Sequence, residues 1–169
     1  MTQNDYKYAV VDLEATGTGS SAKIIQIGIV LIENGIITKT YETDVNPHEE
    51  LDEHIKELTG LNDDRLGRAP EFSQVAAEVY ELIQDAIFVA HNVKFDANIL
   101  GEDLFWDGFD LLTPRVDTVE LAQVFYPTFD KYTLGNLGNL LDISLEYAHT
   151  ALADAQDLSL ITISEPTRL

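Results

Sequence analysis

Three apolar segments of strand length follow one another in the N-terminal part of the chain. They cover residues 6–15, 23–33 and 36–45, and Asn34-Gly35 separates the second from the third. An Asn-Gly pair between two β-branched apolar runs predicts a tight hairpin, because both turn positions require a positive φ angle. We therefore predict a meander of three strands in which the third is antiparallel to the second.

Beyond residue 45 the apolar residues adopt helical spacing, interrupted by short apolar runs. Residues 86–90 are continuously apolar, as expected of a strand buried on both faces, and residues 116–118 are predicted to form a further short strand. Helices are predicted at residues 52–58, 72–83, 93–103 with Asn92 as its N-cap, from residue 118 through Phe125, and at residues 134–141 and 151–161. This order indicates an α/β domain whose central mixed sheet joins an antiparallel three-strand meander to parallel strands, flanked by helices.

The composition fits one packed domain that covers residues 1–169. A chain of this length with 45% hydrophobic residues can bury a core without a disulfide or a structural metal. The absence of cysteine excludes thiolate zinc sites and cysteine nucleophiles. The N-terminus lacks a signal-peptide pattern, and no apolar run approaches the roughly 18 residues that span a bilayer. We therefore expect no membrane association and a cytoplasmic location.

The charge by itself argues against a nucleic-acid partner. Thirty acidic residues against ten Lys and Arg give a formal charge of −20. Such a surface repels phosphate, whereas a basic patch is the usual mark of a nucleic-acid-binding protein. Taken alone, the charge favours a cation binder, a metal-dependent enzyme or a very soluble protein. A non-catalytic acidic module that binds cations or mimics nucleic acid is one hypothesis that follows.

Two of these acids stand at the end of the first strand. Side chains alternate along a strand, so Asp12 and Glu14 point to the same face about 7 Å apart. No basic residue adjoins them in the sequence, and buried unpaired carboxylates are costly unless a cation is present. The alternative is that the strand frays at Asp12 and both acids are solvated.

A third acid lies on the apolar face of a helix. Asp154 falls on the stripe of the helix at 151–161, whereas Gln156 and Asp157 lie off it. His149 precedes Thr150, the expected N-cap, so the histidine and Asp154 can reach one common site. A solvated acid beside a surface histidine would produce the same spacing.

A fourth acid, Asp96, occupies the first turn of the helix that follows the buried strand. Ligands of α/β proteins commonly bind beyond the end of such a strand, although the helix dipole alone also favours a carboxylate there. Four carboxylates with little histidine suit Mg²⁺ or Mn²⁺. Two such ions about 4 Å apart form the usual arrangement for displacement at phosphorus, and His149 can deprotonate the attacking water.

Three motifs in this order resemble the DEDDh 3′–5′ exonucleases, the DnaQ-like group with a ribonuclease H-like fold. The motifs are Asp12-Leu13-Glu14-Ala15-Thr16-Gly17, His91-Asn92-Val93-Lys94-Phe95-Asp96 and His149-Thr150-Ala151-Leu152-Ala153-Asp154. Leu58–Leu61 and Val116–Thr118 are softer matches, so the resemblance covers about residues 6–160. The overall sequence is most similar to the exonuclease module at the N-terminus of bacterial DinG-type helicase-like proteins. This resemblance would make the chain a fragment of a longer protein or a short stand-alone relative.

The resemblance implies a role for each matched residue. Asp12, Glu14 and Asp154 would bind two divalent cations, Mg²⁺ or Mn²⁺, with Asp12 bridging them and Asp96 holding the second. His149 would be the general base. Residues of the first two motifs would receive the 3′-terminal nucleotide, namely Leu13, Ala15, Thr16, Gly17, Asn92 and Phe95. For Phe95, plain helix–sheet packing is an equal alternative.

Two other residues near the motifs are better explained structurally. We expect His91 to make a structural hydrogen bond and Asp117 to be a strand-end structural acid rather than a further ligand.

The resulting hypothesis is a two-metal 3′–5′ exonuclease that degrades single-stranded nucleic acid, DNA rather than RNA, to nucleoside monophosphates. A 3′ exonuclease of RNA or oligoribonucleotides is the first alternative, and the non-catalytic acidic module is the second. The expected partners are single-stranded 3′ ends and a helicase-like or polymerase domain.

Overall fold

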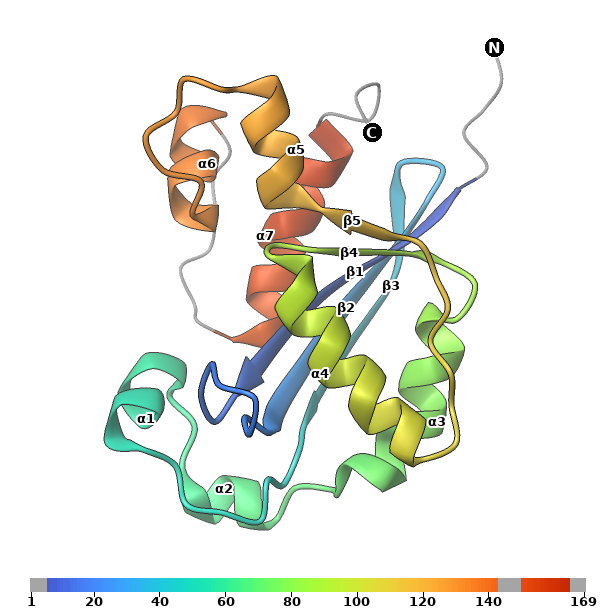
Figure 1. Cartoon of the computed structure of the whole chain (residues 1–169), viewed down its shortest axis with the longest axis vertical. Helices are drawn as coiled ribbons and strands as arrows, with labels where there is room; N and C mark the ends of the chain where they lie inside the picture. Colours follow the sequence, from blue (N-terminus) through green and yellow to red (C-terminus); the bar gives the residue numbers. More distant parts are fainter. Residues whose placement is uncertain (1–5, 143–149, 165–169) are drawn as a thin grey trace.

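The structure is a computed structural model that describes residues 6–142 and 150–164. Its centre is a five-stranded sheet in the order β3-β2-β1-β4-β5 (Figure 1). The strands are β1 (Lys7–Ala15), β2 (Ile24–Glu33), β3 (Ile36–Asp44), β4 (Ile87–Ala90) and β5 (Arg115–Asp117). β2 is antiparallel to both β1 and β3, whereas β4 is parallel to β1 and to β5. The predicted mixed sheet is confirmed.

The hairpin between β2 and β3 forms as the sequence predicts. Asn34 and Gly35 have φ angles of 52° and 73°, so both occupy the left-handed region that this turn requires. The turn fixes the register of β3 on β2, in which Gln26 lies opposite Asp44.

Helices flank the sheet at residue ranges close to those predicted. They are α1 (Glu53–Thr59), α2 (Asp63–Gly67), α3 (Phe72–Ile83), α4 (Val93–Trp106), α5 (Thr118–Phe125), α6 (Leu134–Leu140) and α7 (Ala151–Ser164). The sequence did not predict α2, because five residues are too few to establish a helical period; Asn62 caps it by accepting a hydrogen bond from the Arg65 N–H. None of the helices in the described ranges is long and apolar enough to cross a membrane.

The two faces of the sheet are covered by different helices. Helices α3 and α4 lie on one face of the sheet and α7 lies on the other (Figure 1). Leu13 and its neighbours on one face of β1 pack with α3 and α4, whereas Val10 on the other face packs with α7. In β4, Phe88 belongs to the first cluster and Val89 to the second, so this strand is buried on both faces as predicted. The end of β1 therefore lies between the first turns of two helices.

The start of α4 differs from the prediction. Asn92 adopts a left-handed conformation with φ 69°, and its side chain makes no capping hydrogen bond. Asp117 at the end of β5 does this instead, because its carboxylate accepts hydrogen bonds from the N–H groups of Asn92 at 3.0 Å and Val93 at 3.2 Å. It also accepts from Val119 N–H and so caps α5. Asp117 is the structural acid that the sequence indicated.

Candidate active site

The end of β1 remains paired through both of its acids. Asp12 lies opposite Gly28 and Glu14 opposite Gln26 on β2, and both carboxylate side chains are half-buried. Both point to the face that α7 covers, since they alternate in phase with Val10. The alternative in which the strand frays and exposes the two acids is therefore wrong.

Asp154 meets these two residues from the first turn of α7. Thr150 Oγ1 accepts a hydrogen bond from Ala153 N–H at 3.3 Å, which confirms Thr150 as the cap of this helix. Carboxylate oxygens of Asp12, Glu14 and Asp154 all lie within 4.8 Å of one another. This is a three-acid group, assembled from the first and third sequence motifs, that could hold a metal ion.

The opposite side of α7 corrects one expectation. Gln156 is exposed as predicted, but Asp157 is buried, with 6% of its surface exposed. The reason is that α7 packs on two sides: Ile161, one turn beyond Asp157, joins a cluster with Leu137 of α6. A prediction that assumes a single apolar stripe, and so a single buried face, does not identify all the buried residues of such a helix.

Asp96 stands beside the three-acid group and outside its 4.8 Å limit. It comes from the first turn of α4, on the other face of the sheet, and is 5% exposed. Its Oδ1 accepts a hydrogen bond from the Leu13 N–H at 3.2 Å, so it is fixed to the backbone between Asp12 and Glu14. The second motif thus reaches the same end of β1 as the other two.

Burial and mutual repulsion raise the proton affinity of this cluster. The pKa of Asp12 lies well above its usual value, first because of burial and then because of Asp96, Asp154 and Glu14. Burial, followed by the charges of Asp154 and Asp96, raises the pKa of Glu14 to about 7. Burial likewise raises the pKa of Asp96 to about 7, against the lowering effect of the Leu13 N–H.

Within the described ranges, no Lys, Arg or His forms an ion pair with Asp12, Glu14 or Asp96. Clustered carboxylate oxygens without a thiolate are the donor set that hard divalent cations prefer. The residues present therefore fit Mg²⁺ or Mn²⁺. His149, which the sequence nominates as general base, lies outside the described residues.

The expected substrate-binding residues divide into two groups. Asn92 and Phe95 line a cavity of about 550 Å³ between α4 and the loop of residues 18–22, together with Lys94. The backbone after Asp12 is already partly engaged, because the Leu13 N–H donates to Asp96 and the Thr16 N–H donates to the Lys23 carbonyl at 2.9 Å. Ala15 and Gly17 are half-buried beside it.

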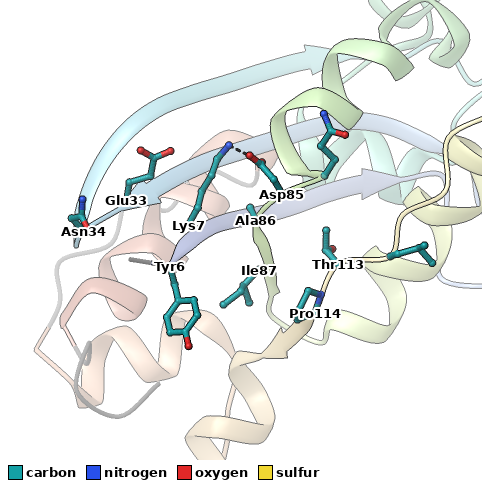
Figure 2. Close-up of a pocket in the computed structure, with 11 residues that line it drawn as sticks. Tyr6, Lys7, Glu33, Asn34, Asp85, Ala86, Ile87, Thr113 and Pro114 are labelled. Atoms are coloured by element: carbon teal, nitrogen blue, oxygen red, sulfur yellow. Dashed lines mark hydrogen bonds and ion pairs between the residues drawn. The ribbon is translucent and has the colours of Figure 1, made fainter. Parts of the chain in front are cut away.

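Two further features lie outside this group of residues. The ring nitrogens of His91 contact Thr118 Oγ1 at 2.9 Å and the Tyr132 carbonyl at 2.6 Å, which is the structural role expected of it. A cavity of about 650 Å³ lies at the opposite end of β1, where Tyr6, Lys7 and Ile87 line it (Figure 2). That cavity shares no residue with the carboxylate cluster.

The sequence reasoning missed two residues of β2 that support the cluster, Gln26 and Gly28. The Ala151 N–H of α7 donates to Gln26 Oε1 at 2.8 Å, and a Cβ on Gly28 would overlap the backbone of Ala151 and Leu152. The available signal was the polar Gln26 within a run of Ile residues.

A mixed sheet with carboxylates gathered at the end of β1, between the first turns of two helices, defines a nuclease-type ribonuclease H-like domain. The exonuclease family model (RNase_T) matches residues 9–161, which is most of the chain. The chain therefore belongs to this exonuclease family.

Two similar proteins, both named 3′-5′ exonuclease DinG, are much longer than this chain. It is 37% identical to the 3′-5′ exonuclease DinG of Bacillus subtilis, over 94% of this chain and 17% of the relative. It is 41% identical to the 3′-5′ exonuclease DinG of Staphylococcus aureus, over 88% of this chain and 17% of the relative. The chain thus spans about a sixth of the length of these relatives.

Solved structures agree on the fold. The nuclease domain of 3′hExo, described as a DEDDh family member bound to rAMP, superposes with a TM-score of 0.84 and 17% identity, over 99% of this chain and 94% of that one. Exonuclease X in complex with 5′ overhanging duplex DNA gives 0.77 and 20%, over 96% and 93%. The predicted ribonuclease H-like fold is confirmed.

The raised pKa of Glu14 predicts a pH-dependent stability. A native pKa of about 7 against 4.5 means that protonation stabilises the native state, so this contribution is present below pH 4.5 and lost as the pH rises through 7. Glu14→Gln should therefore raise the melting temperature in chelator by roughly 5–10 °C at pH 8, and much less at pH 4.5. Circular dichroism melts at both pH values measure this.

Glu81→Gln on the exposed surface of α3 is the matched control, because it removes one charge outside the cluster. Equal increments from the two variants at both pH values would contradict the prediction.

Proposed function

We propose that this domain is a two-metal 3′–5′ exonuclease that hydrolyses single-stranded nucleic acid to nucleoside monophosphates, with DNA as the favoured substrate. The convergence of Asp12, Glu14 and Asp154 within 4.8 Å is the observation that carries this proposal. Membership of an exonuclease family and the names of the DinG relatives support the direction of cleavage.

The four acids would have distinct tasks. Asp12, Glu14 and Asp154 would hold the divalent cations, with Asp12 shared between them, and Asp96 would hold the second cation from the α4 side. When bound, Mg²⁺ or Mn²⁺ would polarise the phosphate and stabilise the negative charge that develops on the attacking and leaving oxygens. Burial raises the pKa of both Glu14 and Asp96, with the charges of Asp154 and Asp96 adding to the effect at Glu14. These raised pKa values favour the role, since a bound cation would stabilise the charged form of each carboxyl group.

His149 would remove a proton from the attacking water. Its position in the sequence, directly before the Thr150 cap of α7, links it to the helix that carries Asp154. An imidazole with an ordinary pKa near 6.5 is suited to this task at neutral pH.

Recognition of the 3′-terminal nucleotide would use the loop after Asp12 and the start of α4. Phe95 and Asn92 line the adjoining cavity, whose volume of about 550 Å³ is within the range of small-ligand sites. Leu13, Ala15, Thr16 and Gly17 precede the loop of residues 18–22 that lines this cavity, and their backbone would contact the nucleotide. Lys94 lies in the same lining and forms no ion pair in the described part of the chain, so it is available to a substrate phosphate.

Most of the other Lys and Arg side chains in the described ranges already form ion pairs with carboxylates. The engaged residues are Lys7, Lys23, Lys56, Arg65 and Arg68. Phosphate contacts supply most non-specific affinity for nucleic acid, so this domain alone would hold long strands weakly. A helicase-like or polymerase domain as partner would provide the additional contacts.

The first test replaces the central acids. Asp12→Asn and Asp154→Asn should reduce hydrolysis of labelled single-stranded DNA more than 10³-fold, because each removes a charged ligand at nearly constant shape. Wild-type protein should gain about 3 kcal/mol of stability at a Mn²⁺ concentration near 100 times its dissociation constant, and both variants should lose that gain.

Chelator-insensitive hydrolysis, or full activity in both variants, would refute the metal assignment. Parallel RNA and DNA substrates distinguish the DNA exonuclease from its RNA alternative, and a complete lack of Mg²⁺-dependent shortening would favour the non-catalytic acidic module.

The second test concerns the general base. His149→Ala should lose about 10²–10⁴-fold in kcat while its Mn²⁺ affinity stays close to that of wild type. Single-turnover kinetics and Mn²⁺ titration measure the two quantities separately. A collapse of Mn²⁺ affinity in this variant would reassign the histidine to metal binding.

The third test concerns Phe95. Phe95→Ala should raise KM several-fold on single-stranded DNA, because base stacking on an aromatic ring contributes about 1–3 kcal/mol. Phe105→Ala on the same helix is the control, since Phe105 is exposed and outside the cavity. Equal KM values in the two variants, with lower stability only for Phe95→Ala, would mean that Phe95 serves packing.

A further inference from the structure

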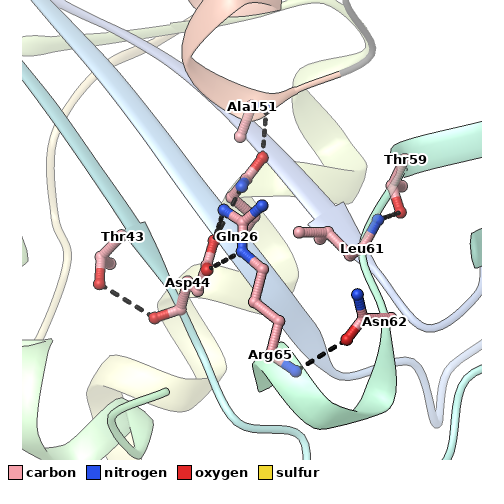
Figure 3. Close-up of polar contacts among 8 residues, drawn as sticks. All are labelled: Gln26, Thr43, Asp44, Thr59, Leu61, Asn62, Arg65 and Ala151. Carbon is pink, nitrogen blue, oxygen red and sulfur yellow. Dashed lines mark hydrogen bonds and ion pairs between the residues drawn. The ribbon is translucent and has the colours of Figure 1, made fainter. Parts of the chain in front are cut away.

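A buried amide connects the start of α7 to the far edge of the sheet. Gln26 is 1% exposed and lies in β2 directly opposite Glu14. Its Oε1 accepts a hydrogen bond from the Ala151 N–H at 2.8 Å (Figure 3). Ala151 is the first residue of α7, and its N–H is among the amides that a helix leaves without an internal partner. Gln26 therefore caps the helix that carries Asp154.

The other end of the same amide is held by an ion pair. Gln26 Nε2 donates to Asp44 Oδ1 at 2.9 Å. Arg65 of α2 grips both oxygens of Asp44, from Nε at 2.6 Å and from Nη2 at 2.9 Å (Figure 3). A carboxylate only accepts hydrogen bonds, so the NH₂ group of Gln26 must face Asp44 and its carbonyl must face α7. The reversed amide would set a donor against the Ala151 N–H.

Gly28, two residues beyond Gln26 in β2, allows α7 to contact the strand directly. Gly28 lies opposite Asp12, and a Cβ at this position would overlap the backbone of Ala151 and Leu152. The register partners of Asp12 and Glu14 on β2 thus both contact the first turn of α7. One fixes its direction by a hydrogen bond, and the other permits its close approach.

From this arrangement we infer that Gln26 is a positioning residue of the metal site, and that Arg65 and Asp44 act through it. The relay Arg65–Asp44–Gln26–Ala151 sets the distance of Asp154 from Asp12 and Glu14. The inference rests on the proposed metal-dependent function. It differs from a merely structural role because it requires a change in cation affinity in molecules that remain folded.

Gln26→Leu tests the relay directly, since leucine fills most of the volume and makes neither hydrogen bond. Mn²⁺ affinity measured by electron paramagnetic resonance at pH 8 should fall about 10–100-fold, as is typical when a residue that orients a ligand is lost. The kcat on single-stranded DNA should fall in parallel. A folded Gln26→Leu protein with wild-type Mn²⁺ affinity would overturn the inference.

A charge exchange supplies the rescue. Gln26→Glu keeps an acceptor for the Ala151 N–H but sets a second carboxylate against Asp44, so its Mn²⁺ affinity should fall. Adding Asp44→Asn restores a donor–acceptor pair of reversed polarity, and the double variant should recover most of the affinity. Absence of recovery, with both proteins folded, would also overturn the relay.

Two surface variants keep the test valid if the buried ones do not fold. Arg65→Ala removes the fork that orients Asp44 and should lower Mn²⁺ affinity several-fold. Arg68→Ala removes a comparable ion pair with Asp64 at the end of the same helix and should leave it unchanged. Identical affinities for these two variants would contradict the inference, whereas a wild-type protein without Mn²⁺ binding would refute the proposed function itself.

Discussion

Repulsion among the carboxylates of Asp12, Glu14 and Asp154 is the constraint on which the rest of the architecture depends. Like charges within 4.8 Å at a half-buried site raise the free energy of the native state, so other interactions must hold strand and helix together. Close packing of α7 on β2 provides one such interaction. The helix dipoles of α4 and α7 partly offset the repulsion, since the positive end of each stabilises an acid in its own first turn, Asp96 and Asp154 respectively.

Local chemistry predicted most of the fold and the convergence of three acids at the end of β1. The three-strand meander and its Asn34-Gly35 turn follow from short-range patterns, and so does the placement of Asp154 on a buried face. The errors came from tertiary partners. Asn92 does not cap α4 because a carboxylate from β5 reaches the same amides, and Asp157 is buried because α7 has neighbours on two sides.

Supporting residues were harder to predict than the candidate ligands. Gln26 and Gly28 are ordinary residues for a strand, and only the approach of α7 makes them important. That approach joins residues 125 positions apart, which no local pattern contains. The relay from Arg65 through Asp44 and Gln26 to Ala151 is likewise formed across four elements of the fold, α2, β3, β2 and α7.

The net charge of −20 acquires a more specific meaning once the contacts are known. Several basic side chains serve ion pairs that secure loops and helices, such as Lys56 with Asp63 and Arg65 with Asp44. Lys94 is different because it lines the cavity between α4 and the loop of residues 18–22 and forms no ion pair in the described part of the chain. The positions of the few basic side chains, more than the excess of acidic ones, therefore determine where a negatively charged polymer can approach the domain.

The position of Asp154 in the chain has a consequence for protein synthesis. All five strands and the helix that carries Asp96 precede α7 in the sequence. During synthesis, Asp12, Glu14 and Asp96 therefore leave the ribosome well before Asp154. The three-acid group requires α7, which carries Asp154, to dock on β2. Any cation-dependent activity of this domain is thus withheld until translation has passed its last described helix.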